Sequence, residues 1–255
     1  MIQGTASGVG KTILSLALCR IFKQDGHNVT PFKAQNMTTN TCLTKNGDEI
    51  AVSQYLQALA AGVEPCIDMG PIVLKPPYSH PTDRESKLKT IMEAYTRLCD
   101  KHDLIVIEGA GSSVELNLNK DDIINMGMAK RANAPVILVS DIDRGGVFAA
   151  LYGSIMLMDE SERAHVKATI VNRFWGDTSL FADGVKILED ITELPVAGVI
   201  PYTKIHLPEE DSLFSNDIFL QTDDFESQFD SIADNVRNHL NIELIYKILN
   251  EGVQQ

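Results

Sequence analysis

Residues 4–12 read GTASGVGKT and lead into an apolar helical run. A strand that ends in a glycine-rich turn and continues into a helix directs several backbone N–H groups at one point, where the helix N-terminus adds partial positive charge. Lys11 can then reach the β- and γ-phosphates of a nucleotide, and the hydroxyl of Thr12 can ligate Mg²⁺. The usual motif begins with glycine where this chain has Thr5, with Gly4 one place earlier, so the pattern predicts a variant phosphate-binding loop rather than an ordinary glycine-rich turn. The residues predicted to contact the nucleotide are Thr5, Ala6, Ser7, Gly8, Val9, Gly10, Lys11 and Thr12.

An acidic residue ends another apolar run. Residues 104–108 read LIVIE, and Glu108 is followed by the small residues of GAGS. A carboxylate at the end of a buried strand suits a Mg²⁺ ligand beside phosphates. The alternative is a carboxylate that caps a tight turn.

A cation and two amides follow the run near 28–33. Residues 31–37 read PFKAQNM, which places Lys33, Gln35 and Asn36 at one strand end. We expect Lys33 to face the same crevice as Lys11, and the alternative is a plain surface lysine.

Two further strand ends carry polar residues. Residues 140–146 read SDIDRGG, and the combination of Asp143 and Arg144 with two glycines favours a substrate-recognition loop over a routine helix-entry turn. Residues 171–174 read VNRF, where a side-chain amide could pair with the edge of a nucleobase, although asparagine after a strand is usually a turn residue.

These residues require a scaffold that brings strand ends together. Apolar runs alternate with helical patterns, which predicts an α/β fold with one doubly wound, mostly parallel sheet and helices on both faces. Ligands bind beyond the carboxyl ends of the strands in such sheets. Strands are predicted at the N-terminus and near 28–33, 104–108, 135–140, 168–172 and 196–200. Helices are predicted near 11–24, 48–61, 85–100, 121–132, 146–158 and 179–190, and a proline-rich loop over 76–84.

Composition limits the function classes. The 255 residues are enough for one large α/β domain or two small ones, and the net charge of −13 argues against nonspecific nucleic-acid or anionic-membrane binding. Anionic ligands must therefore be held by local cations, of which Lys11, Lys33, Lys75 and Arg144 are the candidates.

The four cysteines are scattered without a C-x-x-C pair, which indicates reduced thiols. No apolar stretch approaches the roughly 18 residues that suggest a membrane span, and no secretory leader is apparent. We therefore expect a cytoplasmic protein without membrane or nucleic-acid partners.

The C-terminal part is predicted to be an acidic tail followed by an amphipathic helix. The apolar stripe of that helix either packs on the domain's own surface or forms a docking face for a partner. The apolar stripe consists of Phe225, Phe229, Ile232, Val236 and Leu240.

Several motifs together resemble the ATP-dependent synthetase domain of cobyric acid synthase, the glutamine-hydrolysing enzyme of cobalamin biosynthesis, within the dethiobiotin synthetase-like P-loop superfamily. The phosphate-binding loop and EGAG are shared with dethiobiotin synthetase, whereas PFKAQNM, DIDRGGVFA and HLPEEDS are specific to the cobyric acid synthase family. The motifs occur in the order GTASGVGKT, PFKAQNM, GDEI…Q..QA.AAGVEP, VLKP, VIEGAGS, SDIDRGGVFA, VNRF and IPY…HLPEEDS, and they cover residues 1 to about 212.

The resemblance implies stepwise amidation of side-chain carboxylates on adenosylcobyrinic acid a,c-diamide, with ATP and Mg²⁺ as cofactors and acyl phosphates as intermediates. The implied catalytic residues are Lys11, Lys33 and Asp143, and the implied metal ligands are Thr12, Glu108 and Glu49 or its neighbour Asp48. The implied substrate contacts are Gln35, Asn36, Lys75, Asp141 and Arg144, and Asn172 is implied to meet the adenine.

The resemblance also sets the expected domain organisation. Residues 1–212 are expected to form the amide ligase domain and 213–255 the acidic tail and C-terminal helix, without a glutamine amidotransferase domain. No cysteine is flanked by glycines as a nucleophile elbow requires, so ammonia is expected from a separate glutaminase domain or subunit. A homodimer is one assembly that the resemblance leaves open. The family also carries a longer segment between Pro76 and the helix at 85.

Three other functions share this loop type. A partner-regulated ATPase of the partition or cell-division type would carry an extra lysine early in the loop, where this chain has Ala6. A dethiobiotin synthetase-like ligase is disfavoured because only the shared motifs match it. The remaining alternative is a binding subunit that has lost amidation activity.

Overall fold

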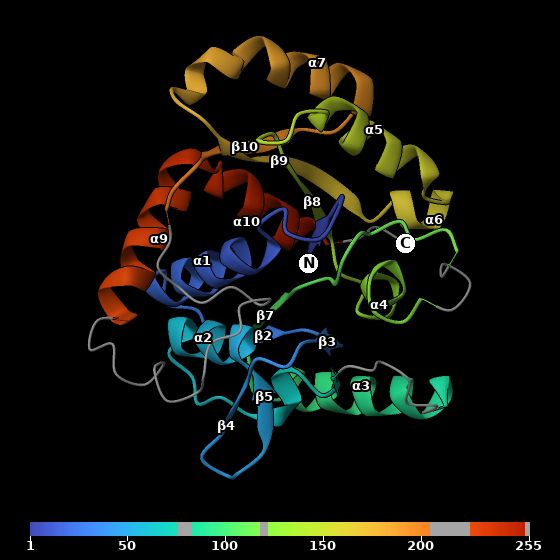
Figure 1. Ribbon diagram of the computed structural model, residues 1–255, viewed down its shortest axis with the longest axis vertical. Coiled ribbons are helices and arrows are strands. Elements are labelled where there is room, and N and C mark those ends of the chain that lie inside the picture. Colours follow the sequence, from blue (N-terminus) through green and yellow to red (C-terminus); the bar gives the residue numbers. More distant parts are fainter. Residues whose placement is uncertain (76–82, 118–121, 205–224, 253–255) are drawn as a thin grey trace. The chain divides into compact units, whose positions relative to one another are not determined.

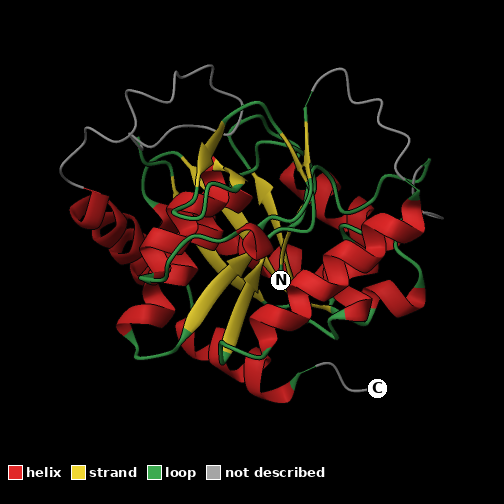
Figure 2. Ribbon diagram, turned by 90° about the horizontal axis from the view of Figure 1, so that it is seen from below, coloured by secondary structure: helices red, strands yellow, loops and turns green. Residues whose placement is uncertain are grey.

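Short apolar strands alternate with helices along the chain, as predicted, and the fold is α/β with parallel strands (Figure 1, Figure 2). The computed structural model describes residues 1–75, 83–117, 122–204 and 225–252. Contacts divide the chain into two units. Unit 1 comprises Met1–Lys11, Gly109–Lys204 and the residues from Asp234 onward, and unit 2 comprises Thr12–Glu108 and the preceding part of the C-terminal helix.

Unit 1 contains a four-stranded parallel sheet. Its order is β1 (Ile2–Gly4), β8 (Val136–Asp141), β9 (Val166–Phe174) and β10 (Val196–Pro201). Ile2 is paired with Ile137, and at the carboxyl edge Asp141 is paired with Asn172. The phosphate-binding loop leaves β1 at this same edge, so parallel pairing gathers the predicted polar residues of unit 1 there.

Helices cover both faces of this sheet. Helices α5 (Val147–Leu157) and α7 (Ala182–Thr192) pack against each other and against the sheet on one side, and α10 (Ile242–Glu251) contacts β10 on the other (Figure 1). The core between α5, α7 and the sheet is apolar, with Leu138, Leu151 and Leu188 fully buried. The helices of unit 1 are α4 (Met126–Arg131), α5 (Val147–Leu157), α6 (Glu160–Arg163), the 3₁₀ helix η3 (Thr178–Phe181), α7 (Ala182–Thr192) and α10 (Ile242–Glu251).

Unit 2 contains a second parallel pair, β2 (Val29–Phe32) and β7 (Leu104–Ile107), in which Phe32 is paired with Ile107. Its other strands are the parallel pair β3 (Asn36–Met37) and β6 (Val73–Leu74) and the antiparallel pair β4 (Thr41–Leu43) and β5 (Glu49–Ala51). Its helices are α1 (Lys11–Gln24, which begins at the last residue of unit 1), α2 (Val52–Ala61), η1 (Ile67–Met69) and α3 (Arg84–Cys99). Helix α9 (Phe225–His239) is divided between the units at Ala233.

Two predicted helices differ from the structure. The helix expected over 48–61 is wrong in its first part, because a turn closed by the Gly47 N–H on Thr44 O folds Glu49–Ala51 back as β5. The helix expected over 121–132 is shortened to α4, because the Asp122 carboxylate accepts backbone N–H groups that a helix would otherwise use. The strand expected over 168–172 is longer, since β9 pairs along both of its edges.

Several short strands and a 3₁₀ helix were not predicted from the sequence pattern. Strands β3, β4 and β6 have two or three residues each, and the helix expected over 179–190 begins as η3 before α7. The predicted C-terminal helix is α9, where Phe229, Val236 and the following Leu240 are buried as a packing stripe requires. Most of the predicted acidic tail, and much of the loop over 76–84, lie outside the described residues.

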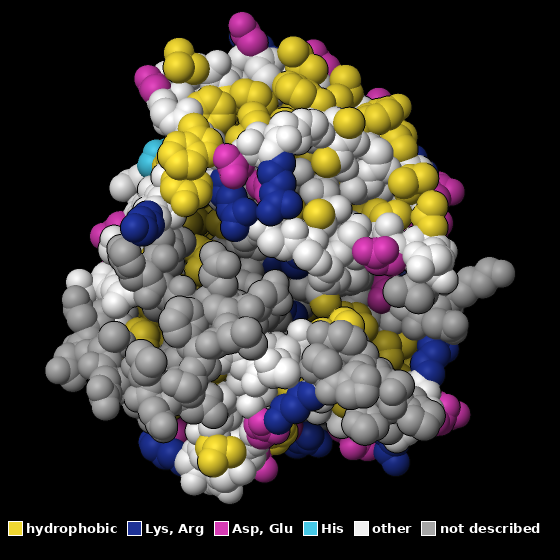
Figure 3. Space-filling view, viewed as in Figure 1, with side chains coloured by type: hydrophobic (Ala, Val, Ile, Leu, Met, Phe, Trp, Pro, Cys, Tyr) yellow, Lys and Arg dark blue, Asp and Glu magenta, His cyan; other side chains and the backbone are white. Residues whose placement is uncertain are grey.

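Helix α5 is apolar on nearly all sides, although only part of it is buried. Val147, Leu151 and Ile155 face the core, whereas Tyr152 and Leu157 are exposed. Further exposed apolar side chains lie on η3 and α7, and Figure 3 shows a hydrophobic region at the top of the view, where Figure 1 shows α5 and α7. Among the described residues, every helix is too short or too polar to cross a bilayer.

Two leucines of α5 test this packing. Leu151→Ala should lower the free energy of unfolding by about 2–5 kcal/mol, because it empties a fully buried position. Leu157→Ala on the same helix removes the same atoms from a side chain that is 53% exposed, so its effect should stay within about 0.5 kcal/mol. Urea unfolding of both variants measures the difference, and equal losses would contradict this description of the core.

Candidate nucleotide-binding site

The phosphate-binding loop has the backbone geometry that its glycines predict. Gly8 and Gly10 have φ values of 73° and 100°, a region that favours glycine. A Cβ at Gly10 would lie 2.1 Å from Asn172 Nδ2, and one at Gly4 would lie 2.7 Å from a Val9 methyl group. The backbone of the loop therefore packs closely against Asn172 and Val9. A loop whose backbone N–H groups bind an anion needs such a close approach of the main chain.

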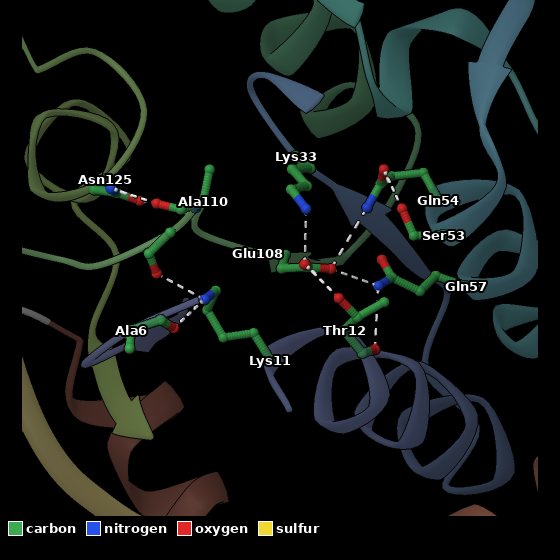
Figure 4. A network of polar contacts seen from close by, with 11 residues as sticks. Ala6, Lys11, Thr12, Lys33, Ser53, Gln54, Gln57, Glu108, Ala110 and Asn125 are labelled. Carbon is green, nitrogen blue, oxygen red and sulfur yellow. Dashed lines mark hydrogen bonds and ion pairs between the residues drawn. The ribbon is translucent and has the colours of Figure 1, made fainter. Parts of the chain in front are cut away.

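Lys11 lies within this loop in unit 1, with its side chain largely buried (Figure 4). Its ammonium donates to Ala6 O at 2.9 Å and to Gly111 O at 2.7 Å. Backbone carbonyls thus hold a cation at the loop, where an incoming phosphate could replace or join them.

Asn172, at the carboxyl end of β9, contacts the same loop. Its Nδ2 donates to Val9 O at 2.8 Å. The next residue, Arg173, has a φ of 60°, and the pairing of β9 with β10 is irregular here. Such an irregularity re-aims side chains at a sheet edge, and it places Asn172 on the phosphate-binding loop. The assignment of Asn172 to adenine stays a prediction.

Glu108 is the centre of a buried polar cluster in unit 2. Its carboxylate is fully buried and pairs with the Lys33 ammonium at 2.9 Å. Thr12 Oγ1 donates to the same oxygen at 2.8 Å, and Gln57 Nε2 donates to the other at 2.7 Å (Figure 4). Gln54 approaches that second oxygen at 3.5 Å. The structure therefore brings Lys33, Glu108 and the threonine of the loop into contact, while their assignment to phosphate and metal stays a prediction.

The charge of Glu108 is maintained by these partners. Burial alone would raise the pKa of Glu108, but the charge of Lys33 and the hydrogen bonds from Gln57, Lys33 and Thr12 lower it below the ordinary value. The carboxylate is therefore ionised at neutral pH. Because folding lowers this pKa, the pair stabilises the fold above the ordinary carboxyl range and loses that contribution as the pH falls through the lowered pKa.

Thr12 and Glu108 supply the ligand types that Mg²⁺ prefers. A hydroxyl oxygen and a carboxylate oxygen are hard donors, and Mg²⁺ usually completes its shell with water and substrate phosphates. Among the described residues there is no cluster of three or more His, Cys, Asp and Glu side chains that could hold a metal by itself. The donor set therefore fits a metal that binds together with a nucleotide.

Glu49 forms its hydrogen bonds with residues outside the Glu108 cluster. Its carboxylate accepts hydrogen bonds from Lys75 and Thr41, of which the bond from Lys75 does most to lower the pKa of Glu49. Among the described residues, neither Thr12 nor Glu108 is bonded to Glu49. Its assignment as a second metal ligand, like that of the adjacent Asp48, stays a prediction.

The predicted amides of 31–37 are buried. Gln35 and Asn36 are at most 7% exposed, and both polar atoms of the Asn36 amide lack a partner among the described residues. An unsatisfied buried amide is uncommon, and a ligand is one way to satisfy it.

The loop after β8 has partners that the sequence did not reveal. Asp141 lies 3.7 Å from the Arg173 guanidinium, and Asp143 accepts a hydrogen bond from Trp175 Nε1 at 2.6 Å. Trp175 also stacks on Tyr202, with ring centroids 4.0 Å apart. Arg144 is exposed.

The glutamines of α2 were also missed as functional residues. Gln54 and Gln57 are three residues apart on a mostly apolar helix, and both are fully buried. That spacing puts both glutamines on one face of the helix. Two polar residues on a buried helix face are the sequence signal that could have identified them as functional candidates.

The Lys33–Glu108 pair has a measurable effect on stability. Lys33→Met should lower the free energy of unfolding at neutral pH by about 3–5 kcal/mol, because it leaves a buried carboxylate without its cation. Adding Glu108→Gln to that variant should restore much of the loss. Denaturant titrations of both proteins give the comparison, and a double variant no more stable than Lys33→Met would contradict it.

The sequence of this chain is similar to that of known proteins. Residues 1–209 match the model of a family described as an AAA domain. A cobyric acid synthase of Listeria monocytogenes serovar 1/2a is 47% identical over 235 residues, which is 85% of this chain and 46% of that protein. A cobyric acid synthase of Streptococcus sanguinis is 48% identical over 84% of this chain and 46% of its own length. The chain thus spans about half the length of the curated relatives it matches.

Solved structures support the fold. Chloroplast FtsY from Physcomitrella patens is similar with a TM-score of 0.51 and 18% identity, covering 91% of this chain and 64% of that one. This likeness concerns the fold alone. Because the family match spans most of the sequence, this chain belongs to the AAA domain family, and it is a homologue of the cobyric acid synthases over the part that they share.

Proposed function

We propose that this chain is an ATP-dependent amide ligase that amidates side-chain carboxylates of adenosylcobyrinic acid a,c-diamide in cobalamin biosynthesis. The observation that carries the proposal is the buried, ionised Glu108, bonded to the hydroxyl of Thr12 and to the Lys33 ammonium. A carboxylate beside the threonine of a phosphate-binding loop suits Mg·ATP, and a buried cation suits a transferring phosphoryl group. The relatives named cobyric acid synthase supply the substrate class.

The proposed chemistry has two steps. An oxygen of the substrate carboxylate attacks the γ-phosphorus of ATP, the bond from that phosphorus to the bridging oxygen breaks, and ADP leaves. Ammonia then attacks the acyl carbon, inorganic phosphate leaves with its oxygen, and the nitrogen loses a proton. Phosphorylation is needed because a free carboxylate is a poor electrophile.

The protein contributes position and charge compensation to both steps. Lys11 is assigned to the β- and γ-phosphates, and Lys33 to the transferring phosphoryl group or the acceptor carboxylate. Thr12 and Glu108 would hold Mg²⁺, which supplies charge neutralisation at the phosphates. Lys33 already faces a carboxylate oxygen, that of Glu108, which supports its placement beside anionic groups.

Substrate binding is assigned to polar residues at the strand ends. Asn36 offers an unsatisfied buried amide, and Lys75 offers an ammonium that now pairs with Glu49. The other assigned contacts are Gln35, Asp141 and Arg144. Asp143 is assigned as a catalytic candidate, and Asn172 is assigned to the adenine base. These roles rest on the sequence resemblance together with the positions described above.

The supply of ammonia is assigned to a separate glutaminase domain or subunit. Burial raises the pKa of the Cys19 and Cys66 thiols and raises that of Cys42 to about 12. A nucleophilic cysteine instead needs a lowered pKa and a neighbouring base. These three thiols therefore lack the character of a glutaminase nucleophile.

Substitutions of the two central residues test the proposal. Lys11→Ala and Glu108→Gln should each lower corrinoid-dependent ADP release by about 100-fold or more, since each removes a group that stabilises charge in the transition state. ADP release is measured with MgATP, ammonium and adenosylcobyrinic acid a,c-diamide. Lys186→Ala, which changes an exposed lysine of α7, serves as the control and should retain full activity. Full activity in either site variant would refute its role, and ATP hydrolysis that responds to a protein or DNA partner but not to the corrinoid would favour the partition-type alternative.

The nitrogen source provides a second test. Ammonium salts should support amide formation by this chain alone, whereas glutamine should not. Burial raises the pKa of the Cys19, Cys42 and Cys66 thiols, and the exposed Cys99 is not flanked by the glycines that a nucleophile elbow requires. Mass spectrometry of the corrinoid product counts the amides that form under each condition. Glutamine-dependent product, or glutamate release by the purified chain, would show that the assignment of the ammonia source is mistaken.

A further inference from the structure

The segment that follows Glu108 is fixed to β1 at both of its ends. The Gly109 N–H donates to Ile2 O at 2.9 Å, and the Ser113 N–H donates to Gly4 O at 2.8 Å. Between these bonds Gly111 has a φ of 63°, and its carbonyl accepts the hydrogen bond from Lys11. One peptide carbonyl in the middle of a short arch therefore faces the lysine of the phosphate-binding loop.

Asn125 holds this arch on both sides of Gly111, and Figure 4 shows its contact with Ala110. Its Oδ1 accepts from the Ala110 N–H at 2.8 Å, and its Nδ2 donates to Ala110 O at 2.7 Å and to Ser112 O at 2.8 Å. One carboxamide thus makes three hydrogen bonds to the two neighbours of Gly111. These bonds fix the peptide groups on both sides of the Gly111 carbonyl, which limits the orientations that glycine would otherwise permit.

The backbone that carries Asn125 is itself fixed. The Asp122 carboxylate accepts from the N–H groups of Asn125 at 2.8 Å and of Gly127 at 2.7 Å. A Cβ at Gly127 would lie 2.0 Å from Asp122 O, so this turn is tightly packed. The carboxamide is therefore presented from a rigid base.

We propose that Asn125 is a positioning residue for Lys11, acting through the carbonyl of Gly111. A lysine side chain has many rotamers, and ordering it before phosphate binds reduces the entropy lost on binding. Asn125 orients the Gly111 carbonyl, and that carbonyl together with Ala6 O orders the ammonium. The inference rests on the proposed function only in assigning Lys11 to the triphosphate, and it is independent of the corrinoid and of the amidation step.

A double-mutant cycle on MgATP affinity tests this relation. Isothermal titration calorimetry is carried out on the unaltered chain, Asn125→Ala, Lys11→Ala and the double variant. Asn125→Ala should raise the Kd for MgATP about tenfold when Lys11 is present and less than about twofold when Lys11 is alanine, because a residue that acts through another has no effect without it.

Two further variants separate positioning from folding. Asn125→Asp keeps the shape and the acceptor for Ala110 but replaces the two donors by an oxygen, so it should weaken MgATP binding at least as much as Asn125→Ala. Asn241→Ala removes a capping asparagine of unit 1, which accepts from the Leu244 N–H, and should lower the melting temperature without changing the Kd.

The outcomes are distinct. Equal weakening by Asn125→Ala with and without Lys11, or an unchanged Kd in both Asn125 variants, would overturn the positioning role while leaving the proposed function intact. An unchanged Kd in Lys11→Ala would instead remove the premise that both share.

Discussion

A carboxylate buried without water must have its charge compensated locally, and in unit 2 that requirement brings four elements together at Glu108. Lys33 directly follows β2, Glu108 directly follows β7, Thr12 lies in the first turn of α1, and Gln57 projects from α2. The register of β2 on β7 places Lys33 and Glu108 beside each other, and a slip of one residue would move one of them to the opposite face. The local fold and the proposed chemistry thus depend on the same ion pair.

In unit 1 the corresponding constraint is close packing of backbone around the phosphate-binding loop. Side chains are excluded at Gly4 and Gly10 by contacts with Val9 and Asn172. The sheet edge and the arch at Gly111 then surround the loop with carbonyls and amides, so the lysine is held by main-chain atoms. Such atoms are fixed by the fold, which makes them suitable for orienting a flexible side chain.

Much of this arrangement could be predicted from the sequence because its signals are local. The loop motif predicts Lys11 and Thr12 as phosphate and metal contacts. The apolar runs that end in Lys33 or Glu108 indicate parallel strands whose carboxyl ends carry candidate site residues. The second strand of the hairpin, Glu49–Ala51, falls within the helix predicted over 48–61, because the turn at Gly47 depends on backbone hydrogen bonds rather than on periodicity.

Roles that depend on distant partners could not be predicted in the same way. Gln57 and Asn125 act on segments 51 and 15 residues away, and a single glutamine or asparagine in a helical or turn region has many ordinary explanations. The same holds for the contact of Trp175 with Asp143, which joins residues 32 positions apart.

That last contact has an optical consequence. Trp175 is the single tryptophan of the chain, it is 62% exposed, and its indole touches both Asp143 and the ring of Tyr202. Emission excited at the red edge of the protein absorption band therefore comes from one side chain bonded to the loop after β8. Any rearrangement of that loop alters the polarity and the stacking around one fluorophore, so the molecule carries an intrinsic spectroscopic label without chemical modification.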